Sequence, residues 1–480
     1  MGANLVVAIL ILCVTSHAQN NEYIDRNTIV LALVLAAQTH LALAMERRRR
    51  DPFVILLVFT MIFYFSLRIV TLALYPFSSV FLRYSYGPAN SNFALTFIIA
   101  ANVFLYAGLW CVRSRQNIFI RSEAWIPTSP TRIVVLMLVS IIYSYLSGVY
   151  WTPDDMPRIV GFVGIFVSPV IILQMALSYF ILFRRSMNRM AALLIATLIV
   201  LEVAAHTLAG SRSGITTLLQ NTMVAMLAIW SCIQVKRKVF IVSCALAPVV
   251  LVLLIGAFTL STYNRSHKDA VGSVDLVRAV ELAGEATTEI GADTELDILL
   301  PPIFDRAGFF DYSAEIIANR DQYGEVFKLS SYAKSIVDNL LTPGFDVYDQ
   351  PKASNALQFI YEDLGTPSKE MVSESYQSDQ FGIYGEFYGL FGYGSLPLFF
   401  LAAFLLKRGY VRLTNNSPFV FAMKRIVVLS VFIKIIDSYG MDWTIIETVP
   451  LVASVFLYTF FFRSRRIAPR IAHGPAVLQA

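Results

Sequence analysis

Long apolar runs separated by short polar connections dominate the chain. A helix needs about 20 apolar residues to cross a bilayer. Twelve runs approach or reach that length, at 4–20, 28–46, 52–76, 92–112, 132–150, 158–183, 190–209, 215–234, 239–261, 382–406, 417–436 and 446–462. The pattern therefore predicts an all-α polytopic membrane protein with about 12 transmembrane helices.

Basic residues gather after every second run. The clusters are Arg47–Arg50, then Arg113, Arg115 and Arg121, then Arg184, Arg185 and Arg189, then Lys236–Lys238, then Lys407, Arg408 and Arg412, and last Arg463–Arg470. Connections rich in Lys and Arg stay on the cytoplasmic side of a membrane. We therefore expect both termini to be cytoplasmic and every connection after an odd-numbered helix to be external.

The polar stretch 262–380 is the largest of these external connections. It holds 21 of the chain's 33 Asp and Glu but only 9 of its 38 Lys and Arg. Helix-like stretches at Val274–Thr288 and Ser313–Arg320 predict a partly helical external loop between helices 9 and 10. The chain then divides into helices 1–9 (1–261), the loop domain (262–380), and helices 10–12 with a basic cytoplasmic tail (381–480).

Composition narrows the class of protein. Mean hydropathy is +0.62 and 15% of residues are charged, against roughly 25% in soluble domains. The net charge of +5 comes from bases beside membrane segments, so it does not indicate a nucleic-acid partner. The histidines and cysteines have no metal-ligand spacing, and we expect neither a metal nor a cofactor. Residues 4–18 resemble a signal-peptide core but lack a positive n-region, so we expect a short first spanning helix that is not cleaved.

Three basic residues at the external face are candidates for binding a diphosphate. Arg212 lies in Gly210-Ser-Arg-Ser-Gly214, where a tight turn and the start of a helix favour an anion. Arg265 follows helix 9 at the same face, and Lys352 follows Pro351 in the loop. The alternatives are a plain turn whose arginine reaches the lipid headgroups, and a solvated loop lysine.

Two further motifs suggest catalysis and saccharide binding. Arg306 lies in a motif that continues through Asp311, where the alternative is a structural Arg306–Asp311 salt bridge.

Glu386 lies at the start of an apolar helix, where an ionisable group is costly, so it is a candidate general base. Asp379, Tyr384 and Tyr388 lie in the same motif as candidate saccharide contacts, and Gly382, Gly385 and Gly389 would let a sugar approach the backbone. A purely structural carboxylate is the alternative for Glu386. Arg68 and Glu202, charged residues within apolar runs, would pair across helices.

These motifs, in this order, resemble the Wzy-type polymerases of O-antigen and exopolysaccharide repeat units. The resemblance covers residues 190–410 and rests on four stretches and the large loop that they surround. The stretches are Gly210–Gly214, Arg306 with Phe309-Phe-Asp311, Pro343-Gly344 to Pro351-Lys352, and Gly385-Glu-Phe-Tyr-Gly-Leu-Phe-Gly392. Some members carry Arg, ten residues and then Gly in their external loops. Here the matching positions after Arg265 and Arg306 are Leu276 and Ile317, so this pattern is absent.

The resemblance implies a GT-C-like membrane fold in the bacterial inner membrane, with the active site on the periplasmic face. It implies transfer of a glycan chain from its lipid diphosphate onto a new lipid-linked repeat, which releases undecaprenyl diphosphate without metal or nucleotide sugar. The implied partners are the lipid-linked oligosaccharide, the bilayer, a chain-length regulator and a flippase. Two alternatives remain. One is an O-antigen ligase-like transferase; such ligases rely on a loop histidine, and the only histidine of the large loop here, His267, has no motif around it. The other is a lipid-linked oligosaccharide flippase or transporter.

Overall fold

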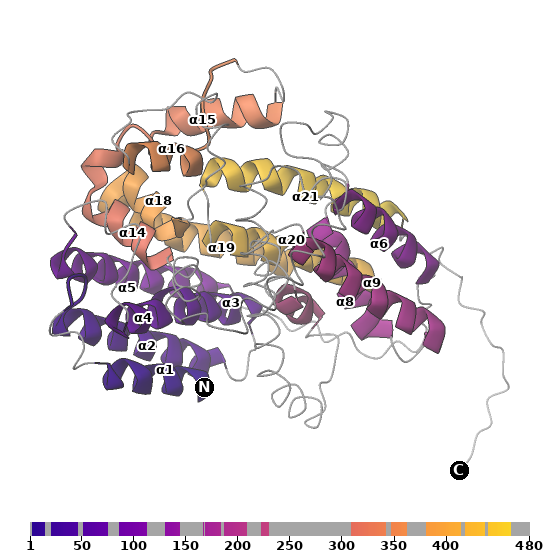
Figure 1. Ribbon diagram of the computed structural model, residues 1–480, viewed down its shortest axis with the longest axis horizontal. Coiled ribbons are helices and arrows are strands. Elements are labelled where there is room, and N and C mark those ends of the chain that lie inside the picture. The colour runs from indigo at the N-terminus through magenta and orange to yellow at the C-terminus, as the bar shows by residue number, and fades with distance from the viewer. Residues whose placement is uncertain are drawn as a thin grey trace, which may run out of the picture.

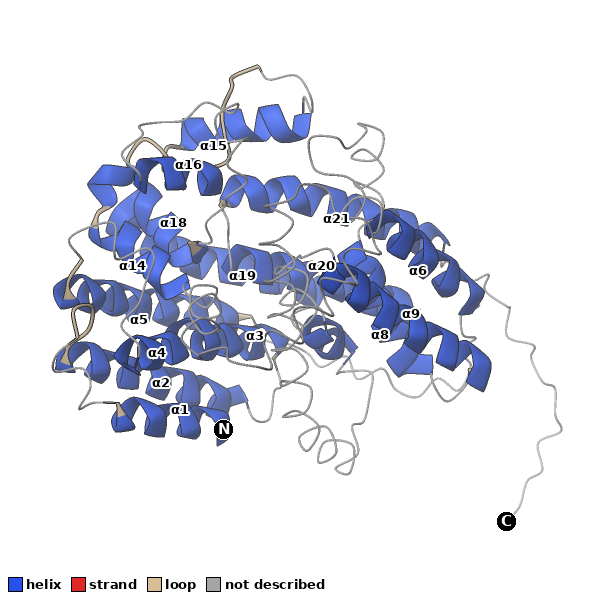
Figure 2. Cartoon of the chain, in the orientation of Figure 1, coloured by secondary structure: helices blue, strands red, loops and turns tan. Residues whose placement is uncertain are grey.

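The structure is a computed structural model in which regular structure is helical throughout the described residues (Figure 2). The described residues are 2–14, 21–46, 51–74, 86–112, 130–144, 167, 169–183, 187–208, 222–229, 309–341, 347–361, 381–413, 418–436 and 440–461. The predicted all-α class is confirmed for this part of the chain. The apolar run 239–261 and the helix expected at Val274–Thr288 lie outside it.

Four helical segments in the described residues are long and apolar enough to cross a membrane. They are α2 (Arg26–Glu46), the continuous α3 (Pro52–Thr60), η2 (Met61–Ser66) and α4 (Leu67–Leu74), then α5 (Pro88–Cys111), and the continuous α18 (Gly382–Phe391), η8 (Gly392–Ser395) and α19 (Leu396–Arg412). They overlap the second, third, fourth and tenth predicted spans. The count of 12 and the GT-C-like arrangement stay predictions.

The remaining helices lie beside these segments or within the acidic stretch 262–380 (Figure 1). We call the acidic stretch 262–380, the predicted loop domain, the insertion. The helices outside it are α1 (Gly2–Cys13), α6 (Pro130–Ser144), α8 (Pro169–Phe183), α9 (Arg189–Leu208), α20 (Pro418–Ile436) and α21 (Met441–Phe461). Those within the insertion are α14 (Phe309–Ala318), η6 (Arg320–Tyr323), α15 (Leu329–Ile336), η7 (Val337–Leu341) and α16 (Ala353–Tyr361). The helix expected at Ser313–Arg320 is α14, which begins four residues earlier.

Contacts at the two ends of the bundle give the spanning segments alternating directions. At one end, Lys407 near the end of α19 forms an ion pair with Asp51, just before α3, and donates to the carbonyl of Leu109 near the end of α5. At the other end, Ser91 in α5 donates to the carbonyl of Tyr23, just before α2, over 2.7 Å. The ends that should share one side of the membrane therefore do meet.

Local sequence explains where two of these segments begin. The carboxylate of Asp51 accepts the backbone N–H of Phe53 over 3.0 Å, and Pro52 occupies the first helical position. That pairing of a capping acid with a proline is favourable, since the first helical N–H groups have no partner inside the helix. In the same way, α5 begins with Pro88 after an extended Gly87.

The first described helix of the insertion, α14, packs directly onto apolar segments that are long enough to cross a membrane. In Figure 1, α14 lies between α5 and α18. Phe309 packs edge-on against Tyr64 with ring centroids 4.1 Å apart, and Ser313 donates to the carbonyl of Phe381 over 2.6 Å. Tyr64 belongs to η2, a π-helical stretch between α3 and α4 in the third predicted span, and π-helical turns are frequent at functional sites. The insertion is therefore anchored on the bundle along the described part of its length.

Candidate functional site

The first half of α18 is the centre of the candidate site because it is buried on all sides and carries Glu386. The exposed fraction of Glu386 is 1%. Its Oε1 accepts the backbone N–H of Met441, the first residue of α21. The first N–H groups of a helix lack partners and carry partial positive charge, which suits a carboxylate. Glu386 therefore joins α18 to the start of α21.

Asp442, the second residue of α21, is a second buried carboxylate beside Glu386. Oδ2 of Asp442 accepts the Ser335 hydroxyl over 2.8 Å and the backbone N–H of Ala353 over 3.1 Å. Those donors come from α15 and α16, so Asp442 fixes both insertion helices to the start of α21. Sequence reasoning missed Asp442, although an acid in the first turn of an apolar helix is a usable signal.

Tyr332 of α15 is the third member of this group. Its hydroxyl is buried, and burial raises its pKa well above its ordinary value, with the negative charges of Glu386 and Asp442 raising it further. The phenol therefore stays protonated beside two carboxylates. Glu386, Asp442 and Tyr332, which we call the α21 cluster, can hold or pass a proton in a space largely closed to water.

A second buried polar group links the insertion to the third predicted span. Arg68 of α4 is fully buried and forms a two-point ion pair with Asp311 of α14. Nη2 lies 2.6 Å from Oδ2, and Nε lies 3.0 Å from Oδ1. This two-point geometry is the strongest that Arg and carboxylate form. The two residues are 243 positions apart in the sequence.

This contact corrects one sequence expectation and changes another. Arg68 does not pair with Glu202, as the sequence suggested; Oε1 of Glu202 accepts hydroxyls of Ser140 over 3.1 Å and Ser144 over 2.9 Å, both from α6. The helices α6 and α9 pack together, so Glu202 finds polar partners on its neighbour. The alternative partner of Arg306, Asp311, is held by Arg68.

Loop geometry around the Pro351-Lys352 stretch is set by Asp338. Its carboxylate accepts three backbone N–H groups, from Val347, Tyr348 and Gln350, over 3.1 to 3.3 Å. These bonds turn the chain toward α16, just before which Lys352 lies half-buried. The carbonyl of Lys352 accepts the backbone N–H groups of Asn355 and Ala356 in the first turn of that helix, both over 3.0 Å. Lys352 is therefore placed beside the insertion helices on the same side of the bundle as the α21 cluster.

The two predicted tyrosines occupy different surroundings. Tyr384 is fully buried, donates to Oδ1 of Asn102 over 2.5 Å, and stacks on Phe399 with ring centroids 5.5 Å apart. One of its faces is therefore covered in this conformation. Tyr388 is 7% exposed and meets Tyr393 edge-on. Arg212, Arg265, Arg306 and Asp379 lie outside the described residues.

In this conformation the glycines around Glu386 leave room for another part of the same chain. A Cβ on Gly385 would lie 3.1 Å from the Cα of Ser313, and one on Gly389 would lie 2.7 Å from the ring of Phe327. Both neighbours belong to the insertion. The space beside these glycines is thus filled by the insertion, which packs directly against the backbone of α18.

Glu315 of α14 is a further buried carboxyl that the sequence did not single out. Its Oε1 accepts Nδ2 of Asn319 over 2.7 Å and the hydroxyl of Tyr323 over 3.0 Å. Its Oε2 is buried without a hydrogen-bond partner among the described residues. Burial raises the pKa of Glu315 above its ordinary 4.5, and the two donors only partly oppose that rise.

The raised pKa of Glu315 predicts a pH-dependent loss of stability. A carboxyl whose pKa is higher in the folded state costs folding free energy as pH rises from its unfolded value through its folded value, because the unfolded chain ionises first. We expect Glu315→Gln, whose amide oxygen can still accept both bonds, to flatten this fall. Thermal unfolding in detergent at a series of pH values measures it. The exposed Glu325→Gln is the matched control, and identical pH profiles for Glu315→Gln and the wild type would contradict the prediction.

Comparisons with known proteins add no relative to this picture. No family model, curated protein or solved structure matches the chain. Within the described residues, no group of three His, Cys, Asp or Glu side chains is placed to hold a metal ion.

Proposed function

We propose that this protein is a membrane glycosyltransferase that polymerises lipid-diphosphate-linked oligosaccharide repeats. The observation that carries the proposal is the α21 cluster. Two buried carboxylates and a protonated phenol gather where the acidic insertion meets the apolar bundle. A substrate with a membrane-embedded lipid and a polar saccharide has to react at such a boundary. The order of the sequence motifs, which resembles that of Wzy-type polymerases, gives the substrate class.

The proposed reaction is one displacement with one proton transfer. A hydroxyl oxygen of the lipid-linked acceptor attacks the anomeric carbon of the donor chain, and a new glycosidic C–O bond forms. The bond between that carbon and the phosphate oxygen breaks, and undecaprenyl diphosphate leaves with the electron pair. Glu386 takes the hydroxyl proton as general base. Arg212, Arg265 and Lys352 neutralise the diphosphate, and Arg306 stabilises charge at the reacting centre.

Substrate entry requires the helices that cover Glu386 to move. Glu386 is enclosed by α14, α15 and the start of α21 in the conformation described here, so a saccharide reaches it only when those helices shift away from α18. Closure of a cover over a bound substrate also excludes water, which protects a glycosyl donor from hydrolysis. Tyr384, Tyr388 and Asp379 remain the proposed saccharide contacts in that open state.

The proposed location is the bacterial inner membrane, with both termini in the cytoplasm and the insertion in the periplasm. The alternation of basic clusters supports this orientation, and four apolar helices suit a membrane protein. A chain-length regulator and a flippase are the proposed functional partners.

Deletion of the gene, followed by gel analysis of surface glycans, tests the proposal. We expect the polymer ladder to disappear while a single attached repeat remains, and a copy of the wild-type gene to restore the ladder. Loss of all attached glycan would instead identify a ligase-like transferase. Accumulation of lipid-linked repeats on the cytoplasmic side would identify a flippase. An unchanged ladder would contradict all three functions.

A further inference from the structure

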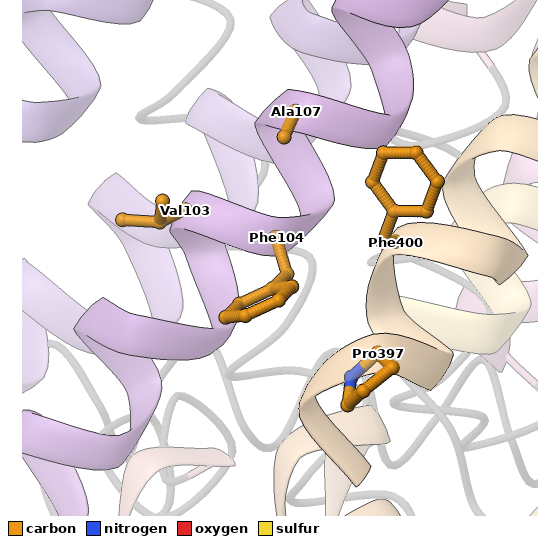
Figure 3. Close-up of a pocket in the computed structure, with 5 residues that line it drawn as sticks. All are labelled: Val103, Phe104, Ala107, Pro397 and Phe400. Atoms are coloured by element: carbon orange, nitrogen blue, oxygen red, sulfur yellow. The ribbon is translucent and has the colours of Figure 1, made fainter.

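An apolar groove runs between two of the spanning helices. Val103, Phe104 and Ala107 of α5 line one wall, and Pro397 and Phe400 of α19 line the other (Figure 3). Its volume is about 280 Å³, and its lining is almost wholly apolar. Val103 is 55% exposed, so the groove opens on the outer surface of the bundle.

Close packing below the groove explains why it exists. A Cβ on Gly108 would lie 2.4 Å from the carbonyl oxygen of Phe400 and 3.1 Å from Cβ of Ala403. Small residues let two helix backbones approach in this way in membranes. The bulky rings of Phe104 and Phe400, next to this contact, then stand on either side of a channel instead of filling it (Figure 3).

An aromatic rim lies at the insertion end of the same two helices. It consists of Phe93 and Phe97 of α5 with Tyr388 of α18 and Tyr393 of η8, whose ring centroids lie 4.7 to 6.2 Å apart. Tyr393 is 60% exposed. From Tyr393 to Phe400 the chain rises roughly 10 Å along the helix axis, and Pro397 lies between them on the groove wall. Rim and groove therefore follow one another along the same two helical segments.

A guanidinium lies directly above the rim. Nε of Arg320 donates to the carbonyl of Gly389 over 3.0 Å, and Nη1 lies 3.1 Å from where a Cβ on Gly392 would be, one residue before Tyr393. Arg320 is exposed. A guanidinium has five N–H donors, and the described residues accept only from Nε and Nη2. The remaining donors are available to an anion beside the aromatic rim.

We propose that Arg320, the aromatic rim and the α5–α19 groove form a binding site for a polyprenyl diphosphate. This site is separate from the one in which Arg212, Arg265 and Lys352 would neutralise the reacting donor. Arg320 would bind the diphosphate of a lipid at the surface of the bundle, the exposed rings of the rim, Phe93 and Tyr393, would hold the first isoprene units, and the groove would take the chain beyond them. The order of cation, aromatic belt and apolar channel matches such a molecule from its headgroup inward. A single narrow groove suits a lipid with one chain better than a two-chain phospholipid. This inference rests on the proposed function for its substrate class.

Binding of saccharide-free undecaprenyl diphosphate to the full-length protein tests the site without any transfer reaction. The protein is placed in phosphatidylcholine nanodiscs, and the dissociation constant is measured with labelled ligand. We expect Ala107→Trp, which fills the groove, and Arg320→Gln, which removes the cation, each to weaken binding about tenfold, as loss of one well-made charged or apolar contact does. Val135→Trp on the exposed face of α6 and Lys328→Gln in the insertion are matched controls that retain wild-type affinity.

Three results would overturn the site. They are unchanged binding by Ala107→Trp, unchanged binding by Arg320→Gln, and equal competition by phosphatidylglycerol, which would show a site for bulk anionic lipid. If Arg320→Gln lowers the unfolding temperature through its loss of contact with α18, Ala107→Trp alone decides. An unchanged glycan ladder on deletion, together with intact and groove-dependent binding, would remove the polymerase function and leave this site standing.

Discussion

Replacement of Arg68 by alanine is expected to lower the free energy of unfolding by about 3–5 kcal/mol, because it leaves Asp311 charged and buried without its partner. Both side chains are at most 2% exposed, and two nitrogens of Arg68 contact the carboxylate. Asp311→Ala is expected to have an effect of the same size. Unfolding of the purified protein in mixed micelles, followed over increasing denaturant, measures the loss.

The double variant Arg68→Met, Asp311→Leu separates charge burial from packing. An apolar pair of similar size removes both charges at once, so it should be considerably more stable than either alanine variant. The exposed Lys328–Glu325 pair, with side chains 48% and 68% exposed, provides the control: Lys328→Ala should change stability by less than about 1 kcal/mol. If Arg68→Ala behaved like Lys328→Ala, the pair would have no structural importance.

Glu386→Gln is expected to abolish most chain formation, by on the order of 10²–10⁴-fold, which is the usual contribution of a general base. The glutamine keeps an oxygen that can accept the N–H of Met441, so the start of α21 stays in place. Turnover and donor binding have to be measured on the same preparation, with Glu325→Gln as the matched surface variant. Normal binding with turnover lost supports the base.

Other outcomes would assign Glu386 differently. Loss of both binding and turnover would make it a positioning residue that holds α21 and α18 together. Turnover that stays normal across neutral pH would remove Glu386 from the mechanism, and the other carboxylate of the α21 cluster, Asp442, would then be the next residue to replace.

Much of the helical framework could be predicted from the sequence because apolar length and basic flanks are local signals. The second predicted span, 28–46, differs from α2 by two residues at its start, and the third ends two residues beyond α4. The burial of Glu386 could also be anticipated, since a carboxylate within an apolar run has a high cost unless it is enclosed and paired. Its partner could not, because a backbone N–H has no sequence signature.

The contacts between the insertion and the bundle could not be predicted for a different reason. Asp311 looks like any other acid in an acidic stretch, and only the fold brings it to Arg68. The glycines of α18 predict room for a ligand, whereas Ser313 and Phe327 occupy that room in this conformation. Sequence alone cannot distinguish a glycine that admits substrate from one that admits another part of the same chain.

The Arg68–Asp311 pair also determines the order in which the protein can be completed during synthesis. Arg68 enters the bilayer with its helix long before the ribosome reaches Asp311, which follows 243 residues later. Until then the amino-terminal helices hold a buried guanidinium that has not yet met the carboxylate of Asp311, and a buried charge is costly within a membrane. We therefore expect an amino-terminal fragment ending before residue 309 to be less stable than the same residues in the full chain, and to be degraded faster by membrane quality-control proteases.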